Sequence, residues 1–188
     1  MKKKIIDIVK EEHTKEDFNY HILLVVKNAL FLGKKLNADL EVLEIAAYLH
    51  DIGRAEYWKG FDFVKEHNIV GYEKSRKILK QFDYSEEFIE KVSNCILSHT
   101  RSKGYEPKTL EEEIIVCADA MAHFDSFLNL FNIFLKETDS FEEAIKILDK
   151  KIDRDWNIKI TFKEAKEASR KNYEAVSLLI KNAKDQIK

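Results

Sequence analysis

The chain has 188 residues, 45% of them hydrophobic, which suits one compact domain with a sizeable core. Its 32 Lys and Arg residues nearly balance 34 Asp and Glu residues, and this formal net charge of -2 excludes a global basic field for nucleic-acid polymers or anionic membranes. No apolar run approaches the roughly 20 residues that a bilayer requires, and the charged N-terminal segment is too interrupted for a secretory signal. We therefore expect a soluble, cytoplasmic protein with no membrane partner.

Apolar residues at three- and four-residue steps predict an all-α fold, and the sequence contains no alternating strand pattern of any length. The whole chain, residues 1–188, is interpreted as a single domain. The predicted helices cover residues 3–12, 15–36, 39–51, 68–82, 86–99, 110–136, 141–151 and 162–186.

Several of these helices carry recognisable start signals. The pairs Thr109/Glu112, Ser140/Glu143 and Thr161/Glu164 fit the capping box, in which side chains satisfy the free amides of the first turn. Ser85, followed by two glutamates, fits a simple N-cap. These signals predict helix starts near residues 86, 110, 141 and 162.

Two connections contain the glycines and aromatic residues that helices avoid, and long ordered loops in helical domains tend to be functional. The first, residues 53–66, contains Tyr57, Trp58 and Phe61. We interpret these aromatic residues first as a lid packed on its own core, and second as a platform for a nucleobase. The second connection, residues 100–108, contains Arg101 and Lys103.

The segment from Ser140 onward predicts two amphipathic helices separated by the stretch DRDWNIKI. Its apolar face is expected to cover the main core, with a homodimer through these helices as the alternative. The residues of this face are Trp156, Ala165, Ala168, Tyr173, Val176, Leu179 and Ile180. We expect no ligand chemistry from this segment.

Cys95 and Cys117 both lie in helical patterns and far apart in the sequence. This placement fits neither a disulfide framework nor a paired-cysteine metal site. We expect both thiols to be small buried side chains.

The histidines fall at predicted helix ends or beside the two loops: His21, His50, His67, His99 and His123. Asp51 follows His50 directly, and Asp119 precedes His123 by four residues, so Asp119 and His123 share one helix face. Imidazole and carboxylate are ligands for divalent zinc, iron, manganese, nickel or cobalt. From spacing alone, one ion held by His21, His50, Asp51 and Asp119 is plausible where partner helices converge.

The stretches NYHILLVVKNAL, AAYLHDIGR and VCADAMAHF, taken together, resemble the HD-domain superfamily of metal-dependent phosphohydrolases. The signature of that superfamily is an isolated His, a His-Asp doublet and a distant Asp. The resemblance covers about residues 14–135 and leaves about residues 139–186 as a C-terminal helical extension. It implies a helical bundle around a buried metal, with His21, His50, Asp51 and Asp119 as the ligands.

Two further stretches, HNIVGYEKSRKIL and LSHTRSKGYEP, are similar to the segments that hold a second metal in some HD proteins. The resemblance implies that His67 and His99 bind a second cation, with Asp51 bridging the two ions. The second stretch departs from the subset that hydrolyses cyclic dinucleotides, because the expected His-His pair is Ser98-His99 here. We infer no cyclic dinucleotide substrate.

The activity that the resemblance implies is hydrolysis of a phosphate ester, such as a nucleotide or another small phosphorylated metabolite, by metal-activated water. Asp51 or a nearby carboxylate would position the water. Arg54, Arg101 and Lys103 would neutralise the phosphate, with an ordinary solvated surface residue as the alternative for each. His123 has two open roles, as a partner of Asp119 or as a phosphate contact. One or two divalent ions are expected, and the ligand types do not distinguish Mn, Fe, Ni, Co, Zn or Mg.

Two other functions stay open. The same ligands serve a di-iron HD-type oxygenase that activates oxygen instead of water. A non-catalytic, nucleotide-sensing HD domain is the second alternative, although such degenerate domains usually lose a ligand, and all four expected positions are filled here.

Overall fold

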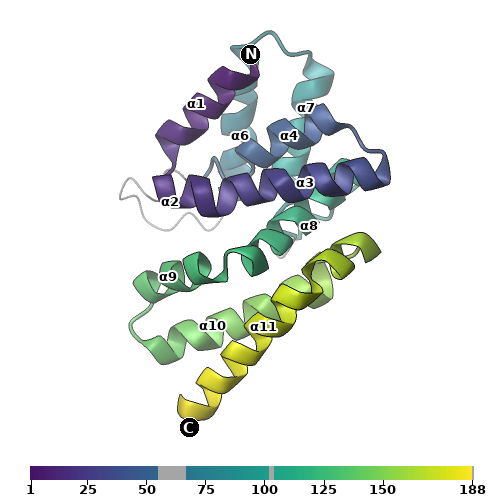
Figure 1. Cartoon of the computed structure of the whole chain (residues 1–188). Helices are drawn as coiled ribbons and strands as arrows, with labels where there is room; N and C mark the ends of the chain where they lie inside the picture. The colour runs from purple at the N-terminus through teal and green to yellow at the C-terminus, as the bar shows by residue number, and fades with distance from the viewer. Residues whose placement is uncertain (55–66, 102–103, 188) are drawn as a thin grey trace.

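The computed structural model describes residues 1–54, 67–101 and 104–187. Within these ranges every regular element is helical and no strand is present, which confirms the predicted all-α fold (Figure 1). The α-helices are α1 (Lys2–Glu12), α2 (Lys15–Asp17), α3 (Leu23–Leu36), α4 (Leu40–Leu49), α6 (His67–Lys80), α7 (Glu86–Ser98), α8 (Leu110–Asp125), α9 (Phe127–Glu137), α10 (Phe141–Arg154) and α11 (Lys163–Ile187). Two π-helical turns, η1 (Phe18–Ile22) and η2 (Asp155–Lys159), complete the described elements.

Helix α8 is the centre of the bundle. Twelve of its 16 residues are buried, as expected for a helix that is apolar on nearly every face. It packs against α3, α4 and α7 on one side and against η2 and α11 on the other. In Figure 1 it lies between the layer of α1, α3, α4, α6 and α7 and the layer of α9, α10 and α11. Chemistry-bearing side chains on α8 therefore reach residues from both layers.

The predicted helix over residues 15–36 contains a π-helical turn. In η1 the backbone N–H of Leu23 bonds to the carbonyl oxygens of both Phe18 and His21, so one turn is wider than the α-helix around it. Turns of this kind are frequent at functional sites, because they shift a side chain out of the regular helical position. His21 lies on this turn and is buried.

The prediction of one helix over residues 110–136 is wrong. Ser126 leaves the helical conformation, with φ of -121° and ψ of 39°, and the axes of α8 and α9 differ by 87°. The Ser126 hydroxyl donates to the carbonyl oxygen of Ala122, four residues earlier. Ser and Asp side chains compete with the helix for such backbone bonds, so Asp125-Ser126 is the sequence signal that the apolar periodicity concealed.

Three of the four predicted capping residues act as caps. Ser85, Thr109 and Ser140 accept hydrogen bonds from the backbone N–H groups of Phe88, Glu112 and Glu143, respectively.

The fourth predicted cap has a different partner. The Thr161 hydroxyl donates to Glu113 on α8, at 2.6 Å, and the backbone N–H of Thr161 bonds to Cys117 Sγ. Cys117 and Cys95 are free and buried, as expected. The start of α11 is therefore tied to the central helix instead of being capped by its own threonine.

The C-terminal segment packs on the same chain. Ala165, Val176 and Ile180 of α11 are buried in the common core. Trp156 stacks on Tyr173 with ring centroids 4.0 Å apart, and both rings contact Phe124 of α8 edge-on. Leu179, which we expected on this face, is instead 56% exposed.

Among the described residues, no single helix combines the length and apolarity needed to cross a membrane. Helices α8 and α9 meet that criterion only when they are taken together across their bend.

Candidate metal centre

Four side chains from three elements converge at the middle of the bundle. His21 comes from η1, the doublet His50-Asp51 follows α4, and Asp119 comes from α8. His21 Nε2 lies 3.1 Å from His50 Nε2 and 3.4 Å from Asp51 Oδ2. Asp119 Oδ1 lies 3.5 Å from His21 Nε2 and 4.0 Å from His50 Nε2. The structure therefore brings together the four ligands that the resemblance implied.

A second group of side chains lies on the other side of Asp51. His67, the first residue of α6, and His99, which follows α7, approach each other with their Nε2 atoms 3.2 Å apart. Asp51 Oδ1 lies 3.6 Å from His67 Nε2 and 3.4 Å from His99 Nε2. Because Oδ2 of the same carboxylate faces His21 and His50, Asp51 is shared between the two groups.

Backbone contacts orient two of the imidazole rings. His50 Nδ1 donates to the carbonyl oxygen of Ala47 at 2.8 Å, and His99 Nδ1 donates to that of Ile96 at 2.6 Å. A neutral histidine with its proton on Nδ1 presents the Nε2 lone pair, and second contacts of this type commonly fix the rings of metal-ligating histidines. His50 and His99 thus present coordinating nitrogens to the two groups.

The spacing of these atoms fits divalent ions. With metal-to-ligand bonds of about 2.1 Å, adjacent octahedral ligands lie about 3.0 Å apart and opposite ones about 4.2 Å apart. The first group spans 3.1 to 4.0 Å, and the second spans 3.2 to 3.6 Å. Buried imidazole nitrogens facing one another at these distances, beside carboxylates, suit coordination better than direct hydrogen bonding. Both groups therefore fit a metal ion.

Burial and charge set the protonation of the site. Burial lowers the pKa of His50 to about 4, so its imidazole is neutral near pH 7. Burial raises the pKa of the Asp51 and Asp119 carboxyls, but nearby histidines and cations outweigh it. Among these, His50 and Arg54 act on Asp51, and His123 and Lys159 act on Asp119, so both pKa values lie well below their usual range. Neutral imidazole and ionised carboxylate are the forms that bind metal.

The C-terminal segment contributes to this centre, so the expectation that it has no ligand chemistry is wrong. Lys159 of η2 is buried and its Nζ donates to Asp119 Oδ2 at 3.0 Å. That bond occupies the carboxylate oxygen that does not face His21, so it orients Asp119 as a one-oxygen ligand. Lys159 is separated from Asp119 by 40 residues, and only the π-helical turn of η2 and its contact with α8 place it there.

His123 connects the same segment to the site. Its Nδ1 lies 2.8 Å from Asp155 Oδ2, and its Nε2 lies 3.4 Å from Asp119 Oδ1. The ring stacks on that of His21, with centroids 5.4 Å apart. Burial lowers the pKa of His123 to about 4. With its proton on Nδ1 and held by Asp155, His123 directs Nε2 toward the first group, which is compatible with both roles that the sequence left open.

The three predicted phosphate-binding cations have different outcomes. Arg54 lies 3.4 Å from Asp51 Oδ2 and is 31% exposed, so it does reach the centre. Arg101 is engaged elsewhere, with both its terminal nitrogens bonded to the Glu113 carboxylate and its Nε to Glu106. Lys103 lies outside the described residues, as do Tyr57, Trp58 and Phe61. The assignment of Arg101 to the substrate phosphate is therefore not supported by its contacts.

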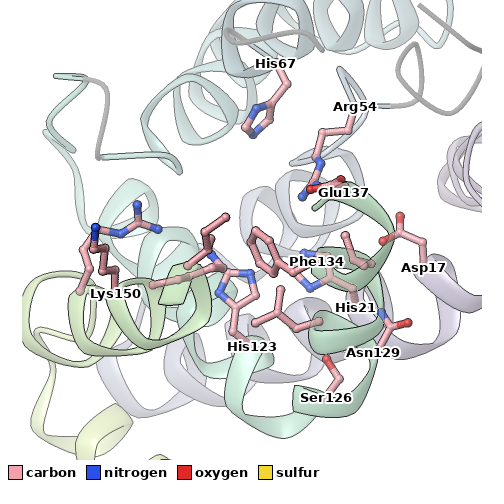
Figure 2. Close-up of a pocket in the computed structure, with 15 residues that line it drawn as sticks. Asp17, His21, Arg54, His67, His123, Ser126, Asn129, Phe134, Glu137 and Lys150 are labelled. Atoms are coloured by element: carbon pink, nitrogen blue, oxygen red, sulfur yellow. The ribbon is translucent and has the colours of Figure 1, made fainter. Parts of the chain in front are cut away.

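Two cavities that share five lining residues open beside the candidate ligands. The smaller, of about 100 Å³, has polar walls that include Asp51, His67, His99, Asp119 and His123. The larger, of about 490 Å³, lies between α9 and α10 and is drawn in Figure 2. Arg54, His67, His123, Lys151 and Arg154 border both.

Lys151 and Arg154 of α10 are functional candidates that the sequence reasoning missed. Both contact Asp155, at 3.3 Å each. They occur in a run of charges, KKIDRD, that reads as an ordinary solvated helix surface. The sequence feature that links them is their spacing of three residues, which places both side chains on one face of α10.

Comparisons with known proteins agree with the fold. The sequence profile of the HD domain matches residues 18–123, a range that holds all six candidate ligands and ends at His123. A crystal structure described as a predicted HD superfamily hydrolase, from an uncultured Thermotogales bacterium, is similar with a TM-score of 0.63. That likeness covers 99% of this chain and 92% of the other chain at 20% identity.

An uncharacterized protein of Clostridium beijerinckii is 35% identical over 87 residues, which is 45% of this chain. The match spans 53% of that relative, so the chain covers about half the length of the curated protein it resembles. Lys151, Asp155 and Lys159 lie beyond the range of the HD profile. Because the profile covers more than half of the chain and includes every candidate ligand, this chain belongs to the HD-domain superfamily.

Proposed function

We propose that the chain is a metal-dependent phosphohydrolase that acts on a small phosphate ester. One observation carries the proposal: the Asp51 carboxylate stands between two groups of imidazole nitrogens, with one oxygen 3.4 Å from His21 and the other 3.4 Å from His99. This arrangement supports two ions, with His21, His50, Asp51 and Asp119 for one and Asp51, His67 and His99 for the other. Divalent ions bound there would activate water and polarise the phosphoryl group.

The chain's own residues complete the proposed site. A phosphate in the small cavity would meet Arg54, Lys151 and Arg154, whose positive charges offset its negative charge. The attraction would grow as further negative charge develops in the transition state. Lys159 keeps Asp119 in position, and His123, held by Asp155, directs Nε2 toward the same space. The surrounding cations favour phosphate chemistry over oxygen activation, which has no need of them.

The proposed function is tested with a chelator-treated sample. Hydrolysis of 4-nitrophenyl phosphate should be absent after chelation and should return with one or more of Mn, Fe, Co, Ni, Zn and Mg. If no phosphate mono- or diester in a broad panel is hydrolysed with any of these ions, the proposal fails. A mixed-valence iron signal from anaerobically purified protein, with oxygen consumption on adding substrate, would favour the oxygenase.

The number of ions is tested separately. Replacing His67 by Ala should lower the metal content by one ion per chain, because it removes one of the three ligands of the second group. His50→Ala should instead empty the first group. Elemental analysis of both variants beside the wild type checks this, and an unchanged metal content in His67→Ala would restrict the site to one ion.

The role of α10 is tested at Lys151. Lys151→Met should raise KM for a phosphate ester by about tenfold, because a charged hydrogen bond to phosphate is worth about 1.5–3 kcal/mol. Its metal content should stay the same, since Lys151 forms its ion pair with Asp155, which is not one of the six candidate ligands. Lys146→Met, an exposed change on the same helix, serves as the control and should behave as wild type.

A further inference from the structure

The larger cavity has an apolar middle and two polar sides of opposite charge. Leu130, Ile133 and Phe134 of α9 and Ile147 of α10 form its apolar walls. Lys150 lies on one side of Phe134 in Figure 2, whereas Asp17 and Glu137 lie on the other. A volume of about 490 Å³ falls within the usual range of about 300–1,000 Å³ for small-molecule sites. The cavity therefore has the size and lining of a site for one small organic group.

The same cavity lies directly beside the candidate metal centre. His21 and His123 border it, and Arg54, His67, Lys151 and Arg154 border both this cavity and the smaller one. A phosphate bound in the smaller cavity would therefore carry its organic group into the larger one. The bend at Ser126 is what brings α9 over this space, because a straight continuation of α8 would lead away from it.

The far side of the cavity carries an excess of negative charge. Asp17 is held by the His13 imidazole, with His13 Nδ1 2.6 Å from Asp17 Oδ2. Glu137 is the second carboxylate there, and Asn129 adds a neutral amide. Arg54 also borders this cavity, and it is already paired with Asp51. A second phosphate or carboxylate on the substrate would be repelled at this end, whereas a hydroxyl or amino group would find acceptors.

We propose that the substrate is a phosphate monoester of one small, largely apolar organic group with no second anionic group at its far end. This inference rests on the proposed function and deepens it by naming the substrate class. An apolar organic group that covers the half-buried side chains of Ile133, Phe134 and Ile147 removes apolar surface from water, which favours binding. A short or polar ester lacks this contribution to binding. Sugar bisphosphates and inorganic pyrophosphate fall outside the class.

The test uses three alkyl esters whose leaving groups have similar reactivity: 2-phenylethyl phosphate, ethyl phosphate and 1,6-hexanediol bisphosphate. With the full-length, metal-loaded protein, kcat/KM for 2-phenylethyl phosphate should exceed that for each of the others by about tenfold or more. Phe134→Ala and Ile147→Ala should each reduce the ratio of 2-phenylethyl to ethyl phosphate by several-fold. Leu135→Ala, on the same helix but outside the cavity lining, should leave that ratio unchanged.

The outcomes separate the two proposals. Asp51-dependent hydrolysis with equal or greater kcat/KM for ethyl phosphate or the bisphosphate would overturn the inference and leave the proposed function standing. An unchanged ratio in both Phe134→Ala and Ile147→Ala, with circular dichroism showing folded protein, would overturn it as well. No hydrolysis of any ester would remove the proposed function and the inference together.

Discussion

Asp51→Asn is expected to abolish binding of both metal ions and to lower phosphohydrolase activity by at least about 10³-fold. The substitution keeps the volume of the side chain, replaces one carboxylate oxygen by an amide nitrogen that cannot coordinate, and leaves the other oxygen without its negative charge. Oδ2 faces His21 and His50, and Oδ1 faces His67 and His99, so one change weakens both groups at once. No other candidate ligand has this double role among the described residues.

Elemental analysis and phosphate release measure the two effects together, with circular dichroism to confirm that the helices persist. Asp125→Asn is the matched control, because Asp125 is an exposed carboxylate at the end of α8 that accepts hydrogen bonds from Asn28 and Asn172. The control should keep its metal and its activity. Full metal content in Asp51→Asn would contradict the shared-ligand geometry, and full activity would contradict the phosphohydrolase mechanism.

Gly53→Ala is expected to destabilise the protein by about 3 kcal/mol or more and to disturb the second ligand group. A Cβ added to Gly53 would lie 2.0 Å from the carbonyl oxygen of His67 and 2.6 Å from the backbone nitrogen of Gly71. Both atoms belong to the backbone of α6, which cannot move aside as the end of a side chain can. Relief requires α6 to shift, and His67 shifts with it.

The midpoint of urea unfolding measures the loss of stability, and the metal content measures the loss of the second group. Gly33→Ala is the matched control: its added Cβ meets only the side-chain ends of Leu43 and Leu40, which can rotate. Since alanine also favours the helix at this position, we expect a net change within about 1 kcal/mol. Equal stability of both variants would show that the approach of Gly53 to α6 is looser than its geometry indicates.

The side chains of the first candidate group were predictable because their residue types and helical positions can be read from short stretches of the sequence. His50 and Asp51 are adjacent at the end of an apolar helix, and His21 and Asp119 lie on helices with clear periodicity. The resemblance to HD domains then supplied the pairing across the bundle. His67 and His99 could be named in the same way, and the structure brings them to the opposite oxygen of Asp51.

Two predictions used charge and periodicity without tertiary partners: the structure contradicts the single helix over residues 110–136, and it gives Arg101 other contacts. Arg101 stands beside a loop, which suggested a phosphate contact, but Glu113 lies close in space and binds its guanidinium. The apolar pattern of residues 110–136 continues across Ser126, and a single hydroxyl contact with Ala122 accompanies the change in direction. Arg101 and Glu113 are 12 residues apart, and only the fold brings them together. Asp125-Ser126 is a local signal, but its effect depends on competition between alternative hydrogen bonds.

The sequence by itself determined the all-α class, most helix starts and the side chains of the candidate metal centre, since propensity, capping and ligand type are local properties. Only the tertiary structure decided that Lys159 orients Asp119, that Lys151 and Arg154 face the site, and that α9 covers it. It also showed that Gly53 is required for the close approach of α6 and not for a special backbone angle. These features depend on contacts between different elements, and only the packing of the helices against one another brings those elements together.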